Sequence, residues 1–97
     1  MLGSAGLSTP DQRAAQILAR VRAIPPGFVR TYGDVDPKAP RLVGHVLATT
    51  RARVPWHRLV RADGSVPMGE AQRARLRREG VPLRGGRVDL ARARIAG

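Results

Sequence analysis

The most informative stretch of the chain for its fold is DPKAPRLVGHVLATT, residues 36–50. The aspartate and two prolines at its start predict a tight turn, and the residues that follow predict a helix from roughly Pro40 to Thr50. Arg41 falls in the first turn of that helix, on the side opposite its apolar face. A short helix entered through a tight turn, with an arginine at its start, is typical of a helix-turn-helix recognition helix. The apolar face consists of Leu42, Val43, Val46 and Leu47.

Two further helices are predicted on either side. Thr9 is a hydroxyl N-cap in front of a proline, and apolar residues recur from Ala14 at the i, i+3, i+4 and i+7 spacing of a buried helical face. Pro25-Pro26-Gly27 ends this helix, and a short β-like piece follows within residues 28–35. The third helix is predicted over Gly69 to Glu79, with Gly80 as its C-cap. Its expected inward positions are unusually polar: Gln72, Leu76 and Glu79.

The C-terminal part predicts little regular structure. Val81 to Leu90 can form a short strand or a hairpin through Gly85-Gly86, and we expect the tail from Ala91 to Gly97 to be loosely held. The whole pattern predicts a small α/β domain that is mostly helical. It is winged-helix-like if residues 40–50 form a recognition helix, and the alternative is an ordinary short helix with an exposed arginine near its start. We expect residues 1–97 to form this single domain, with its core at about residues 9–90.

The charge of the chain indicates a polyanionic partner. The formal net charge is +11, from 18 basic and 7 acidic residues, and Lys38 is the only lysine. Arginine binds phosphate bidentately and stacks on bases, so the excess favours a nucleic acid. The alternative is that the arginines only supply solvated surface through compositional bias.

Other function classes are disfavoured by what the sequence lacks. It contains no cysteine, which excludes disulfides, thiol nucleophiles and thiolate metal sites. With only His45 and His57, and no clustered carboxylates beside them, we expect neither a metal site nor a cofactor. No apolar run is long enough for a membrane span, and no signal peptide is recognisable at the start. We therefore expect a cytoplasmic protein with no membrane association.

The motif Pro55-Trp56-His57-Arg58-Leu59-Val60 resembles the active-site motif Pro-Cys-His-Arg-Val-Val of the O6-alkylguanine-DNA alkyltransferase family. It is still more similar to the alkyltransferase-like proteins, in which tryptophan takes the position of the alkyl-accepting cysteine. The resemblance extends over about Gln12 to Leu83 in four ordered blocks. The other three blocks are Ile24 to Gly33, Arg41-Leu42-Val43-Gly44, and Gln72 with Leu76 and Glu79-Gly80-Val81.

The resemblance implies a role for each matching residue. Tyr32 would crowd a phosphate and help to rotate the damaged nucleotide out, while Arg41 would enter through the minor groove and fill the vacated stack. Trp56 would wall the lesion pocket, with backbone groups near Trp56 and Leu59 reading the guanine edge. The implied DNA-binding residues are Tyr32, Arg41, Gly44 and Arg58, and the implied pocket residues are Tyr32, Trp56, His57, Leu59 and Glu79.

The resemblance also implies that no alkyl group is transferred. In the enzymes a cysteine, histidine and glutamate produce a thiolate, whereas the indole of Trp56 has no lone pair available for displacement at an alkyl carbon. His57 and Glu79 are therefore expected to hydrogen-bond beneath the pocket in a structural role. The expected function is that of a monomeric, non-enzymatic sensor of O6-alkylguanine in double-stranded DNA, which flags the lesion for nucleotide excision repair. The alternative is a winged-helix nucleic-acid-binding module without lesion specificity.

Two departures from the family pattern concern the DNA-binding segments. Only eight residues separate Tyr32 from Arg41, fewer than the family usually has, so the first helix of the helix-turn-helix is expected to shrink to a turn. The loop from Arg61 to Met68 is also short, with no clear counterpart of the arginine that related proteins place over the flipped base.

Overall fold

The structure, a computed structural model, describes residues 10–95. Its helices are α1 (Pro10–Arg22), α2 (Tyr32–Val35), α3 (Pro40–Thr49), the 3-10 helix η1 (Trp56–Arg58), α4 (Gly69–Arg78) and α5 (Leu90–Ala93). The strands have two residues each: β1 (Arg30–Thr31), β2 (Leu59–Val60), β3 (Leu83–Arg84) and β4 (Arg87–Val88). The mostly helical α/β class and the three long helices are thus confirmed, while the predicted N-cap Thr9 lies outside the described residues. None of the described helices is long and apolar enough to cross a membrane.

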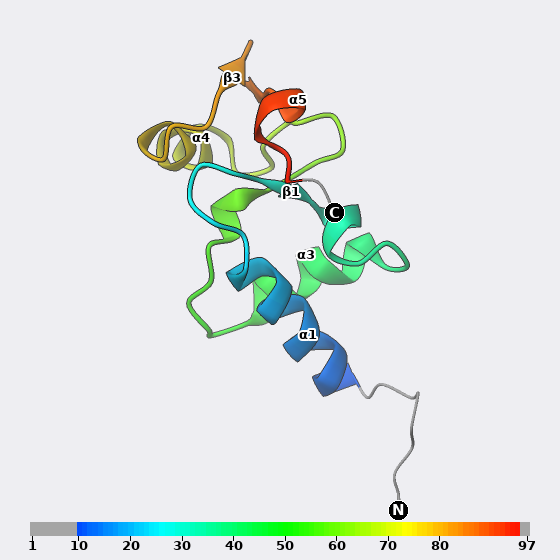
Figure 1. Cartoon of the computed structure of the whole chain (residues 1–97). Helices are drawn as coiled ribbons and strands as arrows, with labels where there is room; N and C mark the ends of the chain where they lie inside the picture. The colour runs from blue at the N-terminus through cyan, green and yellow to red at the C-terminus, as the bar shows by residue number, and fades with distance from the viewer. Residues whose placement is uncertain (1–9, 96–97) are drawn as a thin grey trace, which may run out of the picture.

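The parallel pair β1–β2 divides the hydrophobic core into two clusters. Arg30 pairs with Leu59 and Thr31 with Val60, and successive strand side chains point to opposite faces. Leu59 therefore packs with α1 and α3, whereas Val60 packs with α4 and the C-terminal segments. In Figure 1, β1 lies between α1 and α3 on one side and α4 and α5 on the other. The first cluster contains Ile17, Val21, Ile24, Val35, Val43, Val46 and Leu59. The second contains Val29, Val60, Val66, Leu76, Val81, Val88 and Ala93.

The second cluster depends on a close backbone approach at Gly64. The carbonyl of Gly64 accepts a 2.8 Å hydrogen bond from the backbone N–H of Val88 in the β3–β4 hairpin. A Cβ at position 64 would lie 2.4 Å from the carbonyl oxygen of Val88, and the φ of Gly64 is +83°. Only glycine meets both conditions, so the loop after β2 docks directly under the predicted hairpin.

The prediction of a loosely held tail is wrong for residues 91–95. Ala93 is fully buried, and Val29 forms a parallel bridge with Arg94. Arg94 also donates from Nε to Oδ2 of Asp34 at 2.9 Å. Residues 91–95 consist mainly of alanine and arginine, so their sequence shows no periodic pattern of large apolar residues. Such a pattern would have been needed to predict that this segment packs against the core. The core extends past Leu90, and residues 96 and 97 lie outside the described part.

Candidate nucleic-acid interface

A single helical turn, α2, leads into α3, as expected from the short spacing between Tyr32 and Arg41. A reciprocal capping box starts this turn: the backbone N–H of Asp34 donates to Oγ1 of Thr31 at 3.1 Å, and the N–H of Thr31 donates to Oδ2 of Asp34 at 3.0 Å. Four residues are thus held in helical form without a longer helix.

Asp36 then fixes the turn between α2 and α3. Its Oδ1 accepts the backbone N–H groups of Lys38 and Ala39, each at 3.2 Å. Nε of Arg13 in α1 donates to its Oδ2 at 3.0 Å, and Nη2 of Arg13 donates to its Oδ1 at 2.9 Å. The turn before α3 is therefore joined to α1 by a bidentate ion pair.

Arg41 lies exposed in the first turn of α3, as predicted, while Val43 and Val46 are buried beneath it. It borders a hollow of about 340 Å³ between the start of α3 and the loop after β2. The other lining residues are Tyr32, Pro40, Gly44, Arg61 and Pro67. Two arginines thus border one open groove on the surface of α3.

A second hollow, also about 340 Å³, contains Trp56. Its other lining residues are Tyr32, Gly44, Leu47, Ala48 and Met68, so its walls are mainly apolar. The volume lies in the usual range of small-ligand pockets. Tyr32 and Gly44 line both hollows, and a Cβ at Gly44 would meet no atom within 4 Å. The groove of Arg41 and the pocket of Trp56 are therefore neighbours with a common wall.

The phenol of Tyr32 is half-buried at this common wall. Burial raises the pKa of Tyr32 above its ordinary value of 10.0, and the positive charge of Arg61 opposes that rise. The hydroxyl is consequently protonated at neutral pH and can donate a hydrogen bond. This aromatic is positioned at a site boundary and is only partly a core residue.

The indole of Trp56 is held on several sides. The backbone N–H of Trp56 donates to the carbonyl of Val54 at 2.8 Å, and its carbonyl accepts from the N–H of Leu59. The guanidinium of Arg75 lies 5.4 Å from the indole centroid, and the ring of His57 stands edge-on at 6.0 Å. Trp56 thus has a defined orientation at the pocket.

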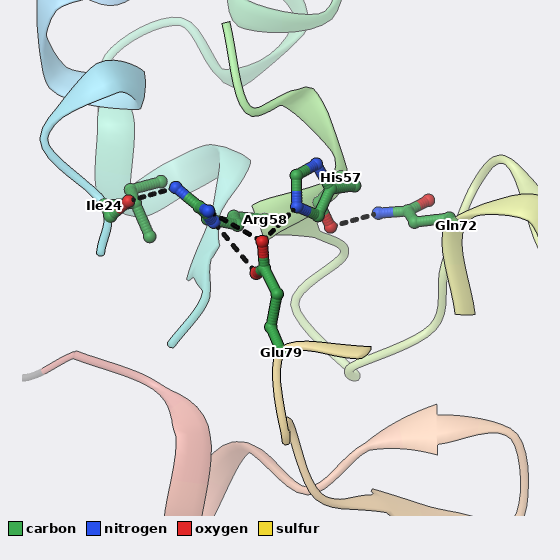
Figure 2. Close-up of polar contacts among 5 residues, drawn as sticks. All are labelled: Ile24, His57, Arg58, Gln72 and Glu79. Carbon is green, nitrogen blue, oxygen red and sulfur yellow. Dashed lines mark hydrogen bonds and ion pairs between the residues drawn. The ribbon is translucent and has the colours of Figure 1, made fainter. Parts of the chain in front are cut away.

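Behind this segment, the carboxylate of Glu79 binds two side chains of the motif (Figure 2). Its Oε2 lies 2.9 Å from Nε2 of His57, which confirms the predicted pair. Arg58 donates from Nε to Oε1 at 2.9 Å and from Nη2 to Oε2 at 2.6 Å. The hydrogen bonds from Arg58, together with His57, outweigh burial and lower the pKa of Glu79 from 4.5 to about 2.

Gln72 explains why the inward face of α4 is polar. Its Nε2 donates to the carbonyls of His57 at 3.0 Å and Leu59 at 2.7 Å, and its Oε1 accepts the N–H of Met68 at 3.1 Å. Gln72 is 1% exposed, so these bonds satisfy the amide in the interior. Figure 2 shows one of these bonds, which joins α4 to the motif.

The predicted site residues fall into two groups. Tyr32, Arg41, Gly44 and Trp56 line the two hollows. His57, Leu59 and Glu79 lie behind them and line neither hollow. Leu59 is fully buried, and its carbonyl accepts a hydrogen bond from Gln72.

The side chain of Arg58, which the resemblance implies as a DNA contact, is directed into the protein. Its side chain is 14% exposed, and its third nitrogen, Nη1, donates to the carbonyl of Ile24 at 2.8 Å. All three guanidinium nitrogens are therefore committed within the protein. Arg58, in η1, therefore links the residues that follow α1 to the C-terminal end of α4. The number of arginines in the sequence could not reveal this internal role.

Five residues at the site were not singled out from the sequence. Leu47 was assigned only to the apolar face of α3, and Arg61 and Arg75 are among many arginines without a distinguishing pattern. Ala48 and Met68 gave no signal, since their role depends on how α3 and α4 flank Trp56. Within residues 10–95, no group of three or more His, Cys, Asp or Glu side chains is placed to hold a metal ion.

The fold and the two hollows define a small helix-turn-helix domain with an apolar pocket beside α3. The family model for the 6-O-methylguanine DNA methyltransferase DNA binding domain matches residues 12–81, and the chain belongs to this family. A DNA base-flipping protein of Escherichia coli (strain K12) is 43% identical over 95 residues, covering 86% of this chain and 71% of that protein. The family resemblance predicted from the motifs is therefore confirmed.

Solved structures share the fold. The S. pombe protein Atl1, in a crystal structure with damaged DNA containing O6-carboxymethylguanine, superimposes with a TM-score of 0.79 at 23% identity. A second crystal structure, of S. pombe ATL in complex with DNA, gives 0.78 at 25% identity. Both alignments cover 94% of this chain and 100% of the other. This likeness supports the predicted winged-helix-like class.

Proposed function

We propose that this protein recognises O6-alkylguanine in double-stranded DNA by turning the damaged nucleotide into the hollow walled by Trp56. The observation that carries the proposal is the common wall of the two hollows, because Tyr32 and Gly44 separate the groove of Arg41 from the pocket of Trp56. The relatives support it: one is named a DNA base-flipping protein, and another was crystallised with damaged DNA.

The geometry suits base flipping through the minor groove. Extrusion of a nucleotide costs a few kcal/mol of unstacking, and an inserted side chain can replace the lost stacking. Arg41 projects from the first turn of α3 and is long and planar enough for that role. Tyr32, between the two hollows, is placed to press on the backbone of the nucleotide as it rotates.

The proposal includes no chemical step. Trp56 stands where the family's enzymes have their alkyl-accepting cysteine, and its indole cannot act as the nucleophile. Glu79 is shared between His57 and Arg58, so the remaining pair serves to hold the motif segment against α4 and the end of α1. The bound lesion is left intact and is flagged for nucleotide excision repair proteins.

The test is a stacking probe beside the lesion. We place 2-aminopurine next to O6-methylguanine in a duplex and follow its fluorescence during titration, because the probe brightens when its neighbour leaves the stack. The wild-type protein should brighten it, and Arg41→Ala should reduce the amplitude and weaken lesion binding by more than one lost phosphate contact. Arg51→Ala, which removes an exposed arginine just beyond α3, is the matched control.

The rival module without lesion specificity makes the opposite prediction. It would bind both duplexes equally with a steep salt dependence, leave the probe dark, and respond alike to Arg41→Ala and Arg51→Ala. For the repair step, incision of a lesion duplex by a purified nucleotide excision repair system should rise when the protein is added.

A further inference from the structure

Arg75 makes a contact with the pocket tryptophan that the proposed function does not yet use. Its guanidinium carbon lies over the indole of Trp56, 5.4 Å from the ring centroid. This distance is within the range of cation–π attraction. Arg75 is itself exposed on α4 and has none of the carboxylate partners that engage Arg73 and Arg77.

The contact lies outside the pocket. Trp56 lines the apolar hollow together with Tyr32 and Met68, whereas Arg75 is not among the lining residues. The indole therefore offers one part of its surface to the hollow and another to the guanidinium. Removing Arg75 would leave the walls of the hollow chemically unchanged and would free the indole that forms one of them.

The helix that carries Arg75 is fixed against the segment that carries Trp56. Gln72, three residues before Arg75 on α4, donates to the carbonyls of His57 and Leu59, which flank Arg58 within the motif. Residues three apart lie on neighbouring positions of one helical face. The buried hydrogen bonds of Gln72 therefore fix the α4 backbone near Arg75 relative to the segment of Trp56.

We propose that Arg75 is a positioning residue of the lesion pocket: it holds the indole plane of Trp56 in place, so that the wall is preformed before a base enters. The inference rests on the proposed function and adds lesion discrimination as the property that Arg75 controls. A preformed wall lowers the cost of ordering side chains on binding. Undamaged DNA, which places no base in the hollow, gains nothing from it.

The experiment uses the full chain with Arg75→Ala, Arg75→Lys and the control Arg78→Ala, which removes an exposed arginine three residues further along α4. Trp56 is the only tryptophan, so emission and acrylamide quenching report on this indole alone. Affinities for O6-methylguanine and guanine duplexes are measured at two salt concentrations.

Arg75→Ala should shift emission to the red and raise quenching, with the preference for the lesion duplex falling about three- to tenfold, as expected for loss of a cation–π contact. Affinity for the undamaged duplex should stay within about twofold, since no phosphate contact is lost. Arg75→Lys should recover most of both signals, and Arg78→Ala should match the wild type.

Two results would overturn the inference while leaving the proposed function standing. One is unchanged emission and quenching in Arg75→Ala. The other is an equal loss on both duplexes with a smaller salt slope, which would make Arg75 a phosphate contact. If the wild type itself shows no preference for the lesion, the proposed function fails and the inference fails with it.

Discussion

Oε2 of Glu79 lies 2.9 Å from Nε2 of His57 in a carboxylate that also takes two hydrogen bonds from Arg58. The contacts with Arg58 and His57 hold the pKa of Glu79 at about 2, below its ordinary 4.5. Because the pKa of this carboxyl is lower in the folded than in the unfolded protein, its ionised form stabilises the fold at pH values above the unfolded pKa. That stabilisation is lost as the pH falls through the folded pKa. The free energy of unfolding should therefore decrease as the pH falls from about 4.5 to 2, because Glu79 is protonated over this range.

Urea unfolding from pH 7 to pH 2 measures this loss. Glu79→Gln should lower stability at pH 7 by about 1–3 kcal/mol, because Arg58 and His57 lose the charged carboxylate while Arg58 keeps the carbonyl of Ile24 and one amide oxygen as acceptors. It should also reduce the further loss of stability between pH 4.5 and 2. Glu70→Gln breaks an ion-pair cluster on exposed α4 and is the matched control, with little expected change. If the stability of Glu79→Gln falls between pH 4.5 and 2 as steeply as that of the wild type, Glu79 is not the group responsible for this pH dependence.

Trp56→Cys should restore no more than weak alkyl transfer. The substitution supplies a thiol beside His57, but here the His57–Glu79 pair serves to hold the motif segment, and the loop from Arg61 to Met68, which borders both hollows, is short. Single-turnover assays with labelled O6-methylguanine duplex measure the transfer, and Trp56→Ala provides the background. Rapid stoichiometric labelling of the cysteine variant would show that the relay is intact and that this reading of Glu79 is wrong.

Gly44 should separate stability from binding. It lies inside α3, and a Cβ there meets nothing within 4 Å, so Gly44→Ala should stabilise the fold by about 0.5–1 kcal/mol. Gly44→Leu would project into the space between Arg41 and Trp56, which both hollows share. The thermal stability of Gly44→Leu should be at least that of the wild type. Its affinity for the lesion duplex should fall at least tenfold, because blocking a central contact surface typically reduces the binding free energy by more than about 1 kcal/mol. Retained lesion binding in Gly44→Leu would place the base elsewhere.

Deleting residues 91–97 should destabilise the protein. The deletion removes buried Ala93, the bridge between Val29 and Arg94, and the ion pair of Arg94 with Asp34. Since Asp34 also caps α2, the turn before α3 should loosen. Thermal unfolding measures the effect, and deletion of residues 96–97 alone is the control. Equal melting temperatures for both deletions would restore the expectation of a loose tail.

The sequence predicts the parts of this protein that depend on local pattern. The turn at 36–40 and the apolar face of α3 place Arg41 correctly, because a proline-rich turn and helical periodicity are short-range signals. The motif at 55–60 likewise locates Trp56 and the pair of His57 with Glu79. These signals need no knowledge of how the segments pack.

What the sequence misses depends on contacts between distant segments. The motif marks Arg58 and nothing marks Arg75, yet neither contact could be read from the sequence: Arg58 closes an internal network with Glu79, and Arg75 lies over the indole of Trp56. Met68 reaches the pocket only because Gln72 docks α4 against the motif. In a chain with 18 basic residues, composition alone cannot distinguish an arginine that binds DNA from one that holds the protein together.

Lesion preference is the central claim, and a competition titration tests it most directly. One oligonucleotide duplex carries guanine, O6-methylguanine or a bulkier O6-alkylguanine at the same position, at matched salt. We expect at least tenfold tighter binding to the alkylated duplexes than to guanine, with most of the preference lost in Arg41→Ala, because a group that fills the stack is removed. Equal affinity of the wild-type protein for all three duplexes would contradict it.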